Sequence, residues 1–98
     1  MSHIVIHRPH PLGSEQIRQA AEDLMERLAR RYDISYHWQD DSLYFERTGI
    51  GGQIDLEPGA IRINARLGFL LAPLKSVLEQ EIHQQLDQIL GDPPPATV

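Results

Sequence analysis

The sequence contains no cysteine, and this absence excludes several kinds of protein at once. Without thiols the chain can form no disulfide, no thiolate nucleophile and no zinc site that depends on sulfur ligands. Positive charge is also scarce, because nine Lys and Arg residues stand against fourteen Asp and Glu residues, giving a formal net charge of -5. A net negative charge repels the phosphate backbone of nucleic acids, so we expect no nucleic-acid partner.

Long apolar runs are missing as well. The longest nearly apolar segment, Leu67 to Leu74, is much shorter than the roughly 20 residues that a membrane-spanning helix requires. The first residues have neither a basic start nor a long apolar centre, which argues against a secretory signal peptide. We therefore expect a cytoplasmic protein without a membrane span.

The residues that are present describe an ordinary globular chain. Of its 98 residues, 41% are hydrophobic and 23% are charged, a composition that favours one small domain with a single core. We expect this domain to cover residues 1–91. The Pro-rich segment 92–98 has little to bury and is expected to be a flexible tail.

Hydrophobic periodicity predicts five strands and two helices. A short β-branched run marks a strand at 3–7, and period-two alternation marks strands at 34–38, 42–46, 54–56 and 61–67. Helical spacing marks 15–32 and 72–90. Ser14 is the expected N-cap of the first helix, whose opposite, charged face, including Arg18, Glu22 and Glu26, is expected to be solvated. Residues 48–52 are rich in glycine and predict a bend.

The order β-α-β-β-β-β-α predicts an α+β fold. Four consecutive strands form a meander of alternating direction, so the first strand can pair antiparallel with the fifth. We expect a five-stranded antiparallel sheet in the order 1-5-4-3-2, with both helices on one face, like a reduced helix-grip fold.

No motif in the sequence supports catalysis. The five histidines lack a metal-ligand spacing, Asp40 and Asp41 fit a turn, and the glycines at 49, 51 and 52 do not form a phosphate-binding loop. No serine lies in a nucleophile motif. We expect a protein that is not an enzyme, with no catalytic residue, metal or cofactor.

Two groups of apolar residues are candidate binding sites. The first lies at an uncharged junction between strand and helix and consists of Leu67, Phe69, Leu70, Leu71 and Pro73. This junction either forms an exposed surface or is buried under the end of the sheet. The second is a set of rings, Tyr36, Trp38 and Phe45, that either line a pocket beneath the helices or fill the core.

Several short motifs support a resemblance to a known family. They are His7-Arg-Pro-His10 with Leu12-Gly13, Ala20-Ala21, Tyr36-His-Trp38, Phe45-Glu-Arg47 with Gly49, and Ala65-Arg-Leu-Gly-Phe-Leu-Leu71 with Lys75. This combination resembles the polyhydroxyalkanoic acid system protein family, small bacterial proteins, over roughly residues 2–91. The resemblance implies a link to polyhydroxyalkanoate storage granules and supplies no catalytic residues.

The leading hypothesis is a non-enzymatic protein that binds the polyhydroxyalkanoate granule surface, or a granule protein, through the apolar residues near Phe69 and Leu71. The alternative is a binding domain of helix-grip type for a small hydrophobic ligand, such as an acyl chain or a hydroxyacid. A third hypothesis is a homodimer formed through the second strand, which the order 1-5-4-3-2 leaves at an edge.

Overall fold

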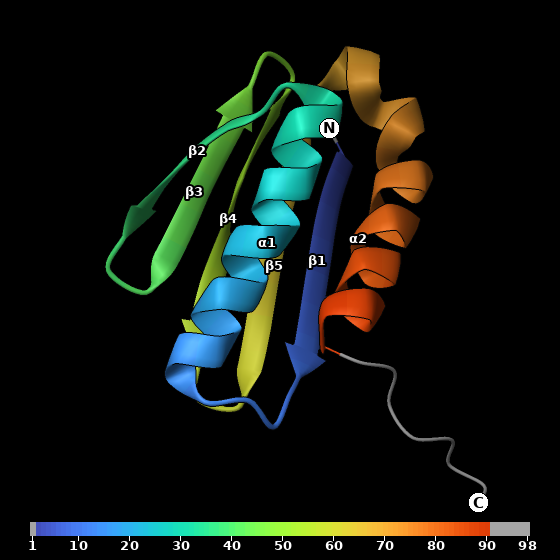
Figure 1. Cartoon of the computed structure of the whole chain (residues 1–98). Helices are drawn as coiled ribbons and strands as arrows, with labels where there is room; N and C mark the ends of the chain where they lie inside the picture. The colour runs from blue at the N-terminus through green and yellow to red at the C-terminus, as the bar shows by residue number, and fades with distance from the viewer. Residues whose placement is uncertain (1, 91–98) are drawn as a thin grey trace, which may run out of the picture.

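The computed structural model describes residues 2–90, which form one sheet and a layer of helices (Figure 1). The elements in chain order are β1 (Ser2–Pro9), α1 (Ser14–Tyr32), β2 (Ser35–Gln39), β3 (Ser42–Arg47), β4 (Ile50–Glu57), β5 (Ala60–Leu67), the 3-10 helix η1 (Phe69–Leu74) and α2 (Lys75–Leu90). The predicted tail, 92–98, lies outside the described residues.

The predicted strand order is confirmed. All neighbours in the sheet pair antiparallel, in the order β1-β5-β4-β3-β2. The register places Ile4 opposite Ala65, Ile63 opposite Ile54, and Ile54 opposite Leu43, so these residues share one face of the sheet. β1 and β2 are the edge strands, and pairing of a second copy with β2 stays a prediction.

Both helices cover the same face of the sheet, as the sequence predicted (Figure 1). Helix α1 buries a continuous stripe against the sheet, made up of Ile17, Ala20, Ala21, Leu24, Met25 and Leu28. Helix α2 contributes fewer residues, namely Leu78, Ile82 and Leu86. The core between the layers is therefore apolar and dominated by Ile and Leu.

The ends of the first helix differ slightly from the prediction. Gly13, not Ser14, occupies the N-cap position, because the side chain of Gln16 accepts a hydrogen bond from the Gly13 backbone N–H at 3.1 Å. At the other end, Asp33 adopts a left-handed conformation with φ 57° and donates its N–H to the carbonyl of Ala29.

The fourth strand is longer than predicted. It begins at Ile50 and includes Gly51 and Gly52, so the glycine-rich bend shrinks to a turn around Gly49. Gly52 has no room for a side chain, since a Cβ there would lie 2.1 Å from the carbonyl oxygen of Asn64 on β5. The glycine therefore allows close pairing of two central strands.

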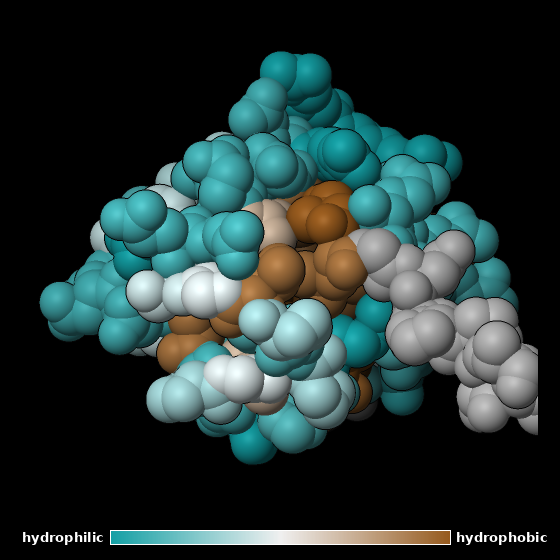
Figure 2. Space-filling view, turned by 60° about the horizontal axis from the view of Figure 1, so that its bottom comes forward, coloured by the Kyte–Doolittle hydropathy of each residue, from teal (hydrophilic) through white to brown (hydrophobic). Residues whose placement is uncertain are grey.

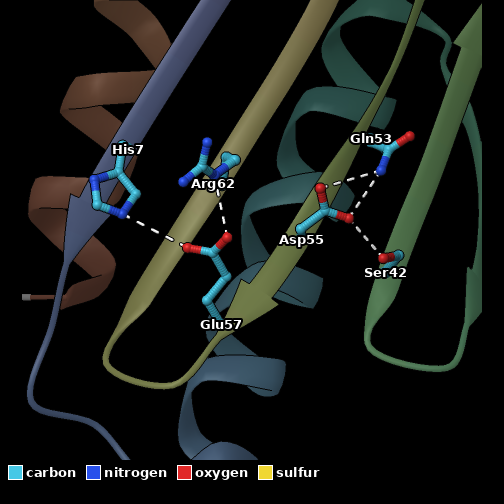
Figure 3. A network of polar contacts seen from close by, with 6 residues as sticks. All are labelled: His7, Ser42, Gln53, Asp55, Glu57 and Arg62. Carbon is cyan, nitrogen blue, oxygen red and sulfur yellow. Dashed lines mark hydrogen bonds and ion pairs between the residues drawn. The ribbon is translucent and has the colours of Figure 1, made fainter.

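Within residues 2–90, no helix covers the opposite face of the sheet (Figure 1), and the carboxylates of Asp55 and Glu57 on this face have polar partners (Figure 3). Asp55 accepts hydrogen bonds from Ser42 at 2.6 Å and from Gln53 at 2.9 Å. Glu57 lies 3.2 Å from Arg62 and 3.6 Å from His7, measured between nitrogen and oxygen atoms. This face is polar, which fits a side that contacts water.

Candidate functional site

A row of exposed apolar side chains lies where β5 leads into the helix layer. We call this row the apolar ridge; it consists of Phe69, Leu70, Pro73, Leu74 and Val77. The exposed fractions are 86% for Phe69, 84% for Leu70, 52% for Val77 and 38% for Leu74, and Pro73 is also exposed. Single exposed apolar residues are common on proteins, but five within nine consecutive positions form a candidate binding surface.

The ridge is held by two glycines. The backbone N–H of Gly68 donates to the carbonyl of Gly49 at 2.8 Å, and the N–H of Leu71 donates to the carbonyl of Gly68 at 3.0 Å. These bonds fix the start of η1 on the turn between β3 and β4. Pro73 then sits in η1 just before α2, instead of in the first turn of one helix over 72–90 as the sequence predicted.

Two of the predicted surface residues do not belong to the exposed row. Leu67 is only 1% exposed, so its prediction as a surface residue is corrected: it is part of the core. Leu71 is half-buried and packs against the core beside Gly49. These two side chains anchor the junction, whereas Phe69, Leu70 and Pro73 project from it.

Helix α2 extends this surface with residues that are mostly uncharged. Within residues 75–90 the exposed positions are Ser76, Val77, Gln80, His83, Gln84 and Gln88. Of its three acidic residues, Glu79 is half-buried, Glu81 accepts from the Tyr32 hydroxyl at 2.6 Å, and Asp87 lies 2.9 Å from Arg8. Burial, together with the hydrogen bond to Glu81, raises the pKa of Tyr32.

The three rings predicted to line a pocket have other roles. Phe45 is 8% exposed and borders an apolar core cavity of about 30 Å³ that neither Tyr36 nor Trp38 lines. Ligand sites usually measure roughly 300 Å³ or more. This cavity is therefore too small for an acyl ligand, and Phe45 is best described as a core residue.

Tyr36 and Trp38 instead fasten β2 to helix α1. Glu22 accepts hydrogen bonds from the Tyr36 hydroxyl and, at 2.8 Å, from Nε1 of Trp38, while the Arg18 guanidinium lies 4.0 Å from the centre of the Trp38 ring. The hydrogen bond to Glu22, with burial, raises the pKa of Tyr36 to about 12. The expectation that Glu22 lies on a fully solvated face is thus wrong, because it is half-buried between two aromatic residues.

A larger cleft lies at the other end of the molecule from the ridge. Its volume is about 480 Å³, and its apolar lining comes from Leu12, Ile17 and Leu56, with Ser14 and Glu15 among its polar residues. Figure 2 views this end, where apolar side chains gather among polar ones. Sequence patterns do not predict this cleft, because it forms where three separate turns meet.

Neither a metal site nor a membrane-spanning helix emerges from the described residues. Over residues 2–90, no three His, Asp or Glu side chains lie close enough together to hold a metal ion. In the same range, neither helix combines the length and the apolar character needed to cross a bilayer.

The fold and the ridge define a small α+β protein with an exposed apolar surface on its helix layer. The family model described as "Putative polyhydroxyalkanoic acid system protein" matches residues 4–90, so the chain belongs to this family, as the resemblance indicated. Comparisons with curated proteins and with solved structures give no match.

Proposed function

We propose that this protein is a non-enzymatic cytoplasmic component of the polyhydroxyalkanoate system that binds the polyester surface of storage granules through the apolar ridge. The observation that carries the proposal is the exposure of Phe69 and Leu70 at 86% and 84%. The family match links the chain to the polyhydroxyalkanoate system and so supports the polyester as the partner that we propose.

The energetics of such contact are favourable at the ridge. Burying one large apolar side chain stabilises a complex by roughly 1.5–3 kcal/mol. Phe69 and Leu70 contribute little to the core, because most of their surface is in water. Their apolar area is therefore available for binding, and covering it with a polymer disturbs no packing in the core.

Co-sedimentation with washed polyhydroxybutyrate particles tests this proposal. The wild-type protein should pellet with the particles at both low and high salt, because apolar contact is screened little by ions. The double variant Phe69→Asp/Leu70→Asp should bind at least about tenfold more weakly, since each substitution replaces apolar contact with a carboxylate. The control Gln19→Asp/Gln39→Asp places the same charges on exposed positions of α1 and β2 and should bind like the wild type.

Two results would contradict the proposal. Equal pelleting of the ridge variant and the wild type, with circular dichroism showing that both are folded, would show that the ridge is not the contact surface. If the wild-type protein stays in solution at all salt concentrations, direct polymer binding is excluded and a granule protein is left as the partner.

The cleft of about 480 Å³ favours a second candidate function, binding of a small ligand. Its volume falls within the range of roughly 300–1,000 Å³ that is typical of ligand sites. Nuclear magnetic resonance titration with methyl 3-hydroxybutyrate should then shift the amides of the cleft residues. Ser14→Trp should block the shifts and Gln19→Trp, on the same helix but outside the cleft, should not; unshifted amides in the wild type would exclude this ligand.

A further inference from the structure

Beside the apolar ridge, helix α2 carries a short strip of uncharged polar residues. We call it the amide strip; it consists of Ser76, Gln80 and Gln84, all exposed. Their spacing of four residues aligns them along one side of the helix. Val77 of the ridge lies on the same face, three and seven positions before Gln80 and Gln84, so the strip continues the ridge for about 12 Å along the helix axis.

The absence of formal charge on this strip matters for what can cover it. A charged side chain pressed against an apolar solid loses its hydration and gains no partner, which costs several kcal/mol. The charged neighbours Lys75 and Glu79 are half-buried instead of fully exposed, and Glu81 is paired with Arg31 at 3.2 Å. The ridge and the strip therefore carry no formal charge themselves, and Asp87, three positions after Gln84 and with a side chain 41% exposed, is paired with Arg8 at 2.9 Å.

The chemistry of the strip selects among apolar surfaces. A glutamine side chain offers two N–H donors, and a serine hydroxyl offers one. A polyester chain presents ester carbonyls, which accept hydrogen bonds, and has no donor except at its hydroxyl end. A hydrocarbon surface has no acceptors, and an anionic lipid surface favours Lys and Arg residues, which are absent from the exposed positions of α2 within 75–90.

We infer that the amide strip is a specificity surface, which donates hydrogen bonds to ester carbonyls when the apolar ridge is seated on the polymer. This inference rests on the proposed function and deepens it, because it names the chemical group that the helix recognises. The ridge provides the affinity for any apolar solid, and the strip provides the preference for a polyester. In this orientation η1 and α2 as far as Gln84 lie along the surface.

The inference is tested by measuring binding to two solids of equal surface area, polyhydroxybutyrate particles and polyethylene particles. The full-length wild type should prefer the polyester. The variant Gln80→Leu/Gln84→Leu removes four N–H donors and adds apolar area. Its ratio of polyester to polyethylene affinity should be about fivefold to thirtyfold lower than that of the wild type, while its binding to polyethylene should be equal or stronger. The control Gln19→Leu/Gln39→Leu makes the same change at exposed positions on α1 and β2 and should keep the wild-type preference.

The opposite substitution separates hydrogen bonding from charge. Gln80→Glu/Gln84→Glu should weaken binding to both solids, because two carboxylates would have to be desolvated. Circular dichroism of each variant checks the fold, and these positions are exposed, so the substitutions leave the core unchanged.

The outcomes distinguish this inference from the proposed function. Equal binding of the wild type to both solids, or an unchanged preference in Gln80→Leu/Gln84→Leu, would overturn the specificity role and leave the ridge proposal standing. Failure of the wild type to bind either solid would overturn both. A dimer in light scattering that Phe69→Asp/Leu70→Asp converts to a monomer would assign this face to a second copy of the chain and would also overturn the inference.

Discussion

The two helices cover the same face of one sheet, yet their solvent-facing sides differ in chemistry. Helix α1 exposes acidic and basic residues of mixed sign, among them Glu15, Glu26, Arg27, Arg30 and Arg31. Helix α2, with η1 before it, exposes apolar residues first and uncharged polar residues next. The inner faces are alike in being apolar, so packing requirements alone do not explain the outer faces. The difference fits the proposal that α1 faces water and α2 faces the polymer.

The largest expected effects come from the inner faces, where the two helices should behave alike. Leu24 on α1 and Leu86 on α2 are both 0% exposed, and truncating either to alanine should lower the free energy of unfolding by about 2–5 kcal/mol. Phe69→Ala and Leu70→Ala should change it by less than about 0.5 kcal/mol, since both side chains are exposed.

Urea denaturation of these four variants measures their free energies of unfolding. A loss of several kcal/mol in Phe69→Ala would show that the ridge is covered by part of the chain in solution. A small loss in Leu86→Ala would show that α2 is weakly packed and that its outer face is not presented on a rigid support.

The second prediction concerns the link between α2 and the sheet. Gly49 has φ 87°, and a Cβ at this position would lie 2.7 Å from Cδ1 of Leu71. Gly49→Ala should therefore lower the free energy of unfolding by about 1–2 kcal/mol through backbone strain, with a further shift of Leu71. Amide hydrogen exchange should become faster at Gly68 and Leu71 and stay unchanged along α1; an equal increase in α1 would contradict a local link.

The sequence predicted most of the sheet but not the details of the junction. Alternation of Ile61, Ile63, Ala65 and Leu67 sets which side chains face inward, and the antiparallel meander sets the order of strands. The form of η1 could not be predicted in the same way. It depends on the hydrogen bond between Gly68 and Gly49, residues that are distant in sequence and meet only after the sheet has formed.

The candidate site was predictable in part for a similar reason. The uncharged run around Phe69 and Leu70 is visible in the sequence, but only the structure separates those exposed side chains from Leu67, which is buried. Helical spacing placed Glu22 on the solvated side of α1, whereas β2 brings Tyr36 and Trp38 against it. A regular pattern gives the direction of a side chain, and a neighbouring strand decides its surroundings.

The third prediction concerns the polar contacts that join α1 to the edge strand β2. Tyr36 has a pKa of about 12, raised from the ordinary value of 10.0 chiefly by the hydrogen bond to Glu22. Because the folded-state pKa lies above the unfolded value, the stabilisation is complete below pH 10 and is lost as the pH rises toward about 12. Glu22→Gln should lower the pKa of Tyr36 and reduce stability at neutral pH by about 1 kcal/mol.

Ultraviolet absorbance of the tyrosinate form measures this pKa, and Tyr36→Phe identifies which of the three tyrosines is responsible. The Glu22→Gln variant should titrate closer to the ordinary tyrosine value. An unchanged titration curve would mean that Glu22 does not interact with Tyr36 in solution.

The smallest expected effect concerns the charged face of α1 where it meets α2. Arg27 donates to Gln85 at 2.6 Å, and both residues lie near solvent. Arg27→Gln should change the free energy of unfolding by less than about 0.5 kcal/mol and should leave polyester binding unchanged, because Arg27 lies outside both the ridge and the amide strip. Urea denaturation and particle co-sedimentation check the two parts. A marked fall in polyester binding would show that the charged side of α1 also faces the polymer, and the proposed division of roles between the two helices would then be wrong.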